Sequence, residues 1–213
     1  KGEPYRVTPL KYAGFFKWLS NKDEGIGHYL KVNMYNGKTE LVELEENMKY
    51  SYSERFGRNV ERHLWKNYPT KIFGTPSFEI DDEGNPFYIA TVYKKLFGLS
   101  GKDATGLLIV NPVDGKIEEY ELDNIPNWVD RVYGADLVEK HLNWHLRFQG
   151  GYWNSLTSKK GVRVATKGYN YIPMNDDIYY YTGVTSDSSD SSNLGFALVN
   201  MRTKEYEYYP LSS

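Results

Sequence analysis

The strongest constraint on the fold of this chain is a pattern of seventeen residues that occurs twice, at 28–44 and at 106–122. The two copies, HYLKVNMYNGKTELVEL and GLLIVNPVDGKIEEYEL, align without a gap and are identical at eight positions. In each copy an Asn-Gly or Asp-Gly pair separates runs of alternating apolar residues. This is the strongest short-range signal of a β-hairpin, because the turn needs a positive φ angle. A degenerate third copy, GFALVNMRTKEYEYYPL, covers 195–211, so we predict a repeated supersecondary unit.

Amphipathic segments precede the second and third copies. In 51–68, apolar residues recur at every fourth position and form one face of a helix; they are Phe56, Val60, Leu64 and Tyr68. Ser51 and Glu54 have the spacing of a capping box, so the helix is expected to begin there. A second helix is predicted over 135–148, with Asp136 suited to its positive end.

Strands are predicted around the hairpins at 77–80, 86–93, 162–166, 169–173 and 177–185. We therefore expect an α+β fold, sheet-rich overall, made of repeated units in which one helix packs on an antiparallel β-meander. Three domains are predicted. A partial first repeat covers 1–50, and complete repeats cover 51–132 and 133–213. Because the first copy lacks a leading helix, residues upstream of Lys1 are expected to complete it.

The amino-acid composition of the chain excludes several classes of function. The chain has no cysteine, which excludes disulfides, thiol catalysis and thiolate metal sites. Its net charge is −2 with scattered basic residues, so no nucleic-acid partner is expected. Twenty tyrosines suit large half-buried sheet faces; the alternative is an aromatic face that binds a ligand. No segment reaches the roughly 20 apolar residues needed to span a bilayer.

No group of residues in the sequence is specific for catalysis or for binding a metal or cofactor. No catalytic residue, metal or cofactor is therefore predicted. His141 and His145 are four apart on a predicted helix near Glu139, a spacing that can hold a metal, but structural histidines are favoured. Acidic turns at 81–85 and 175–177 and the polar loop 186–193 resemble Ca²⁺ sites only in composition. The loop is also expected to be mobile.

Paired carboxylates for glycoside hydrolysis could be drawn from Asp130, Asp136 or Glu139, without a geometric reason to choose among them. Trp128 is expected to plug the base of a sheet, and a binding role is the alternative. Trp128, Tyr179 and Tyr181 are the candidate binding residues.

The repeats resemble the PepSY-type module, in which an apolar strand runs into a turn that ends in Gly, as 110–115 (VNPVDG) does here. The stretches 8–21, 67–73, 78–92, 125–137 and 168–186 also resemble an uncharacterised family of large membrane-anchored proteins of Gram-positive bacteria. The resemblances imply a PepSY/cystatin-like fold in an extracytoplasmic region of the cell envelope, within a membrane-anchored parent chain.

The expected function is therefore a non-enzymatic extracytoplasmic region that binds a protein or cell-wall partner or spaces other domains. Two alternatives stay open. One is a PepSY-like inhibitor or chaperone of a peptidase, and the other is a cell-wall hydrolase with unidentified carboxylates.

Overall fold

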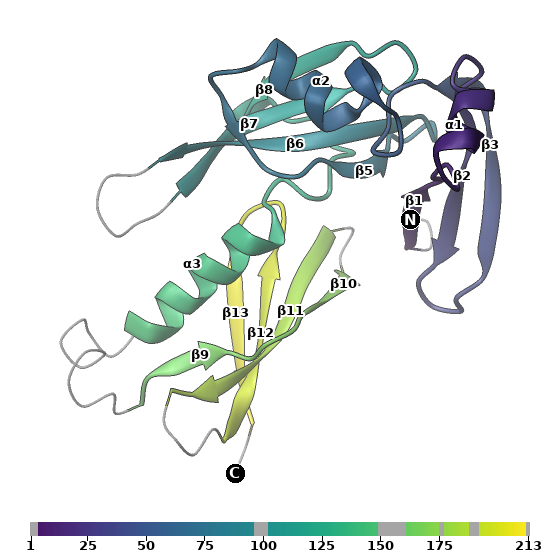
Figure 1. Cartoon of the computed structure of the whole chain (residues 1–213). Helices are drawn as coiled ribbons and strands as arrows, with labels where there is room; N and C mark the ends of the chain where they lie inside the picture. The colour runs from purple at the N-terminus through teal and green to yellow at the C-terminus, as the bar shows by residue number, and fades with distance from the viewer. Residues whose placement is uncertain (1–3, 96–101, 149–160, 175–176, 188–191, 212–213) are drawn as a thin grey trace. The chain divides into compact units, whose positions relative to one another are not determined.

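The chain forms two compact units, Lys1–Val129 and Asp130–Ser213. The computed structural model describes residues 4–95, 102–148, 161–174, 177–187 and 192–211 (Figure 1). Antiparallel sheets dominate both units and α-helices accompany them, so the predicted sheet-rich α+β class is confirmed. The division into 1–50, 51–132 and 133–213 stays a prediction.

The first unit contains two sheets. The smaller sheet has the order β1-β2-β3, and the larger has the order β4-β6-β7-β8 with β5 paired to β6. The elements are β1 (Tyr5–Pro9), α1 (Phe15–Asn21), β2 (Ile26–Asn33), β3 (Thr39–Met48), η1 (Phe56–Arg58), α2 (Val60–Asn67), β4 (Ile72–Phe73), β5 (Ser77–Ile80), β6 (Pro86–Lys95), β7 (Lys102–Val110), β8 (Ile117–Glu121) and η3 (Leu122–Asn124).

The core of the first unit lies between α2 and the larger sheet. Val60 and Leu64 on α2 are fully buried and belong to one apolar cluster with Tyr88 of β6 and Leu108 of β7. Each such side chain contributes about 1.5–3 kcal/mol by leaving water. Tyr29 of the smaller sheet joins the same cluster, so one core holds both sheets.

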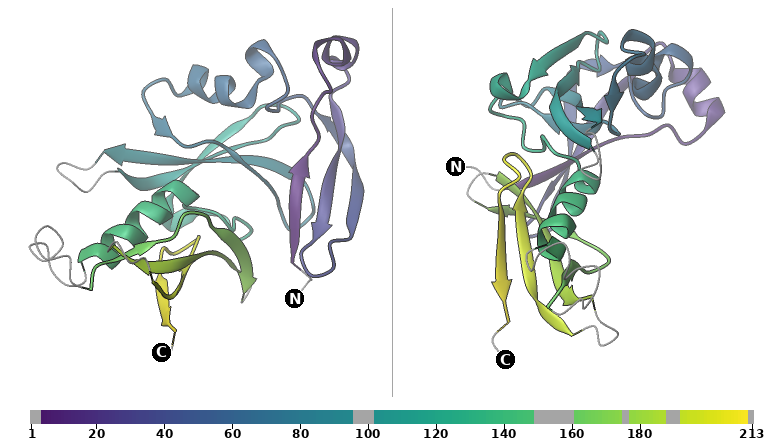
Figure 2. Two further views of the ribbon diagram at one scale, coloured as in Figure 1. Left: turned by 60° about the horizontal axis from the view of Figure 1, so that its bottom comes forward. Right: turned by 90° about the vertical axis from the view of Figure 1, so that its left-hand side faces the viewer.

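The second unit has one sheet of order β10-β11-β12-β13, with β9 paired to β11. Its elements are α3 (Ala135–Phe148), β9 (Arg163–Ala165), β10 (Asn170–Met174), β11 (Asp177–Ser186), β12 (Asn193–Asn200) and β13 (Tyr206–Pro210). Helix α3 lies along one face of the sheet (Figure 2) and buries Leu137, Val138, Leu142 and Leu146.

Three hairpins close with the same turn, one in each sheet. In each, the N–H of an asparagine (Asn33, Asn111 or Asn200) donates to the carbonyl five residues later, at 2.8–2.9 Å. The asparagine Oδ1 accepts from the N–H two residues later, at 2.8–2.9 Å. The turn therefore has four residues between its asparagine and the residue whose carbonyl accepts, where the Asn-Gly and Asp-Gly pairs had indicated a shorter turn.

The fourth residue after the asparagine has a positive φ angle in all three turns. It is Gly37 (71°), Gly115 (79°) or Lys204 (65°), and its N–H donates to the asparagine carbonyl at 2.8–3.0 Å. Left-handed backbone suits glycine and is unfavourable for a residue with a Cβ. Lys204 is therefore an exception at a position where the other two hairpins carry glycine.

The predicted helix at 135–148 is observed at those bounds, whereas the helix predicted from Ser51 begins only at Val60. Ser51 Oγ does accept from the N–H of Glu54 at 3.2 Å, as a capping box requires. However, Asn59 is the true cap, because its side chain accepts from the N–H of Arg62 at 3.1 Å.

Helix α1 was not predicted. Its N-cap, Gly14, provides no side-chain hydrogen bond, so the sequence lacks the usual start signal.

Candidate functional site

Large apolar side chains gather on the surface of the first unit around α1 and η1. We call the group Phe15, Phe16, Leu19 and Phe56 the aromatic patch; these residues are 46, 81, 46 and 74% exposed. Phe15 contacts Phe16 and Trp18 with centroid distances of 5.7 Å, and Phe56 lies 6.0 Å from Trp18. A contiguous exposed apolar group of this kind marks an interaction site more often than isolated exposed residues do.

A buried polar contact anchors the patch. The Nε1 of Trp18 donates to the carboxylate of Glu54 at 2.8 Å, and both side chains are buried. Arg58 donates to the carbonyl of Lys22 at the C-terminal end of α1. Burial and the nearby charge of Glu54 raise the pKa of Tyr12. The short helix α1 is therefore held in one orientation although its outer face is apolar.

The rim of the patch is basic. The guanidinium of Arg55 lies 5.0 Å from the centroid of Phe15 and 5.7 Å from that of Trp18. Lys17 is exposed on α1. Phe56 has a φ angle of 52°, a rare conformation for a bulky residue that often marks a functional site.

The predicted residues Tyr179 and Tyr181 lie on the face of the second unit's sheet opposite to buried Tyr180, because side chains alternate along β11. Both are half-buried. Tyr181 contacts Phe196 at 5.6 Å, and Phe196 stacks on Tyr209 at 4.9 Å and 15°. The structure thus places Tyr181 in an aromatic cluster with Phe196 and Tyr209, and Tyr179 lies on the same side of the sheet.

Trp128, the third predicted residue, belongs to the first unit and lies apart from the aromatic patch in the sequence. Its ring is half-buried and lies 5.0 Å from the ring of Phe87 on β6. This contact agrees with a role in covering the sheet, and its binding role stays a prediction.

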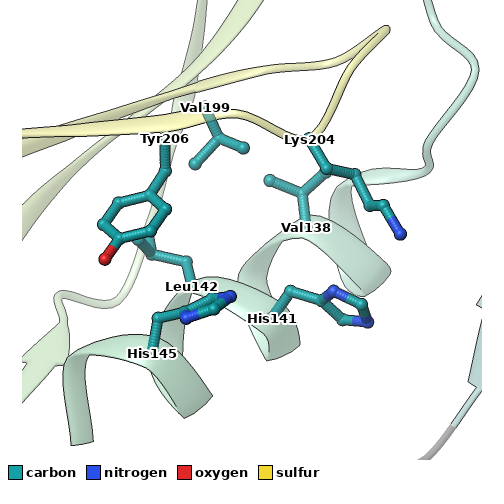
Figure 3. Close-up of a pocket in the computed structure, with 7 residues that line it drawn as sticks. All are labelled: Val138, His141, Leu142, His145, Val199, Lys204 and Tyr206. Carbon is teal, nitrogen blue, oxygen red and sulfur yellow. The ribbon is translucent and has the colours of Figure 1, made fainter. Parts of the chain in front are cut away.

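A cavity of about 180 Å³ lies between α3 and the β12–β13 hairpin of the second unit. Val138, Leu142 and Val199 supply its apolar lining. Its polar lining is His141, His145, Lys204 and Tyr206. Figure 3 shows His145 beside Tyr206 at one end and His141 beside Lys204 at the other. The rings of His145 and Tyr206 stack at 5.1 Å and 26°. The two histidines thus line a cavity beside α3, whereas the sequence favours structural histidines at these positions.

The acidic turn at 81–85 is explained by its own hydrogen bonds. Asp81 accepts from the N–H groups of Glu83 and Asn85 and from the Asn85 side chain, at 2.8–3.0 Å. Residues 175–176 and 188–191 of the other two candidate Ca²⁺ sites lie outside the described residues. Within the described ranges, no group of three or more His, Asp or Glu side chains could hold a metal ion.

The sequence did contain signals for these sites. Phe15 and Phe16 are adjacent, and neighbouring residues on a helix point in different directions, so both could not enter one core. The five residues VERHL (60–64) on α2 recur as VEKHL (138–142) on α3. This second similarity aligns His63 of α2 with His141 of α3, which lines the cavity.

No protein-family model, curated protein or solved structure matches this chain. None of the helices among the described residues is long and apolar enough to cross a bilayer.

Proposed function

We propose that this chain is a non-enzymatic binding region that docks a protein partner through the aromatic patch. The observation that carries the proposal is the exposure of Phe16 and Phe56, which are 81 and 74% accessible although both are large and apolar. An exposed phenylalanine gains about 1.5–3 kcal/mol when a partner removes it from water. Two such residues on an anchored surface supply a centre of the kind that dominates protein interfaces.

The composition of the patch favours a protein partner over a cell-wall glycan. Sugar rings stack on flat, open aromatic faces, whereas the rings of Phe15, Trp18 and Phe56 pack against one another at angles of 34–54°. Aromatic side chains with a flanking arginine are typical of the energetic centre of protein interfaces. Because Arg55 and Lys17 are basic, we expect apolar side chains with acidic neighbours on the partner.

We also propose that the chain is built from repeated units of one helix on an antiparallel meander. Three features support this: the shared asparagine turns, the VERHL and VEKHL helices, and strand orders in which β4–β8 and β9–β13 correspond one to one. The proposal that the chain lies outside the cytoplasm, in a membrane-anchored bacterial protein, rests on the resemblance of its motifs to such proteins.

The partner can be tested by placing a photoreactive phenylalanine analogue at position 16. A matched control carries the analogue at Tyr35, which is 77% exposed on the β2–β3 turn. After irradiation in an extract of the source cells, we expect one protein adduct at position 16 and none at position 35. The adduct should disappear when Arg55→Ala and Phe56→Ala are added. An adduct with lipid alone would assign the patch to a membrane surface and refute the proposal, as would equal labelling at both positions.

A further inference from the structure

The outer face of the β1-β2-β3 sheet is equivalent to the faces that helices cover in the other two sheets. In the aligned repeat, Leu30 of β2 corresponds to Leu108 and Ala197, and Val32 corresponds to Val110 and Val199. The shared asparagine turn fixes this alignment, because these residues lie three and one positions before the asparagine in each hairpin. The three sheets can therefore be compared residue by residue.

In the other two sheets, a helix buries these positions. Leu108 and Val110 are 0% exposed and share an apolar cluster with Leu64 of α2. Ala197 and Val199 are 0 and 3% exposed, and Val199 lines the cavity against α3. In both cases the helix precedes the strands that it covers, as α2 precedes β6 and α3 precedes β11.

The same face of the first sheet is open to solvent. Side chains alternate along a strand and Tyr29 packs into the core of the unit, so Leu30 and Val32 point to the opposite side. Both are only half-buried, and Leu41, the partner of Leu30 on β3, is 57% exposed. Helix α1 packs toward η1 instead, through its buried residue Trp18. We call Leu30, Val32 and Leu41 the apolar stripe; within the described structure, no helix covers it.

Leu41 indicates which kind of residue would cover the stripe. On β8, the equivalent position is Glu119, which is the partner of Leu108 and forms an ion pair with Lys71, a residue that follows α2. A leucine at this position cannot form such a pair. An element that covers the first sheet therefore needs an apolar residue where Lys71 lies over the larger sheet.

Arg6 indicates that the covering element also carries an acidic residue. Arg6 lies opposite Val32, where the other two sheets place buried tyrosines, Tyr88 and Tyr180, opposite the equivalent valines. The Arg6 side chain is exposed and forms no ion pair with another described residue. A buried guanidinium without a partner is strongly unfavourable, so an element that covers this position would place a carboxylate beside it.

We propose that the outer face of the β1-β2-β3 sheet binds an amphipathic helix of the same polypeptide that lies N-terminal to β1. The helix covers the apolar stripe with its own apolar side chains and places a carboxylate beside Arg6. The order of elements selects this occupant, because each of the other two sheets is covered by a helix that precedes it in the chain. The inference rests on the proposed repeat of helix and meander and is independent of the aromatic patch.

A photoreactive phenylalanine analogue at position 41 tests the occupant in the whole polypeptide, produced in its source cells. A matched control carries the analogue at Glu40, which is exposed on the other side of β3. After irradiation, we expect an intramolecular adduct between position 41 and a segment N-terminal to Tyr5, and none from position 40. An adduct with lipid or with a separate protein, or no adduct, would overturn the proposal. Because the aromatic patch is labelled separately at position 16, the two proposals can fail independently.

Arg6→Glu tests the expected carboxylate. In the whole polypeptide, the yield of the adduct from position 41 should fall about tenfold, because the new charge repels the acidic residue of the helix. Lys66→Glu makes the same change of charge at an exposed residue of α2 and should leave the yield unchanged. In residues 1–213 alone, Arg6→Glu should shift the urea midpoint by less than about 0.25 M, because the side chain is exposed; this result shows that the variant folds. Equal adduct yields in the two variants would contradict the proposal.

Discussion

Replacing Gly115 by alanine tests whether Tyr50 fills the space under the β7–β8 turn. Two costs should combine. The first is the φ angle of 79°, which is unfavourable by about 1–2 kcal/mol for a residue with a Cβ. The second is the new methyl group, which would lie 2.3 Å from Cζ of Tyr50 and force that ring to move, at about 1–3 kcal/mol. We therefore expect a loss of about 2–5 kcal/mol in the free energy of unfolding.

Gly37→Ala is an internal control in the same unit. Its φ angle is 71°, and no atom lies within 4 Å of the added Cβ, so only the backbone cost of about 1 kcal/mol should appear. Urea unfolding followed by tryptophan fluorescence measures both. With an m-value of about 2 kcal/mol/M, the midpoint should fall by about 0.5 M for Gly37→Ala and by about 1–2.5 M for Gly115→Ala.

A double-mutant cycle then isolates the steric cost. In a Tyr50→Ala background, Gly115→Ala should cost about 1 kcal/mol, as Gly37→Ala does, because the clash is gone. If the two glycine substitutions cost the same, or if Tyr50→Ala provides no rescue, then Tyr50 does not fill the space.

Three further outcomes follow from particular contacts. Trp18→Phe removes the donor to the buried Glu54 carboxylate and should cost about 1–3 kcal/mol in urea unfolding. Gly106→Ala places a Cβ 2.2 Å from the carbonyl oxygen of Tyr120; since backbone cannot move aside, it should cost about 2–3 kcal/mol by the same measurement. Burial raises the pKa of several tyrosines in the folded chain, whereas in the unfolded chain they ionise near pH 10. The contribution of these neutral phenols to the free energy of unfolding is therefore fully present below about pH 10. It is lost as the pH rises toward the folded pKa values. These tyrosines are Tyr12, Tyr52, Tyr88 and Tyr180.

Each of these outcomes has a matched control. Trp65→Phe alters a tryptophan that is 46% exposed and should cost less than about 0.5 kcal/mol; an equal loss in both variants would contradict the role of Glu54. Gly57→Ala meets no atom within 4 Å and should be neutral. For the tyrosines, circular dichroism should fall as the last phenols ionise. Ionisation of all 20 tyrosines near pH 10 with an unchanged spectrum would refute the prediction.

The sequence pattern predicted the elements whose start, stop and turn signals lie within the element itself. The asparagine turns and the helix Ala135–Phe148 carry their own start, stop and turn residues, and they appear where expected. The predicted start of α2 was wrong. Ser51 and Glu54 have the spacing of a capping box, but the carboxylate of Glu54 accepts a hydrogen bond from Trp18, 36 residues away. A contact of that separation is invisible to a window of local sequence.

The candidate sites were predicted less well, because exposure depends on tertiary packing. Tyr179 and Tyr181 were candidate binding residues, and both side chains are half-buried. Phe16 and Phe56 are far more exposed, and neither was a candidate binding residue. Phe56 belonged to the predicted period of four, but it precedes the observed helix and points outward.

The three hairpin turns show how one backbone can carry different side-chain chemistry. At the fourth position after the asparagine, the φ angle stays between 65 and 79°, so the backbone alone would select glycine three times. At 115, glycine is required for a second reason, because Tyr50 leaves no room for a Cβ, whereas no atom lies within 4 Å of a Cβ added at 37. At 204, the lysine ammonium lies 4.7 Å from the ring of Tyr133. The contact between the Lys204 ammonium and the Tyr133 ring offsets part of the backbone strain, because a cation over an aromatic ring is attracted by the ring's negative face.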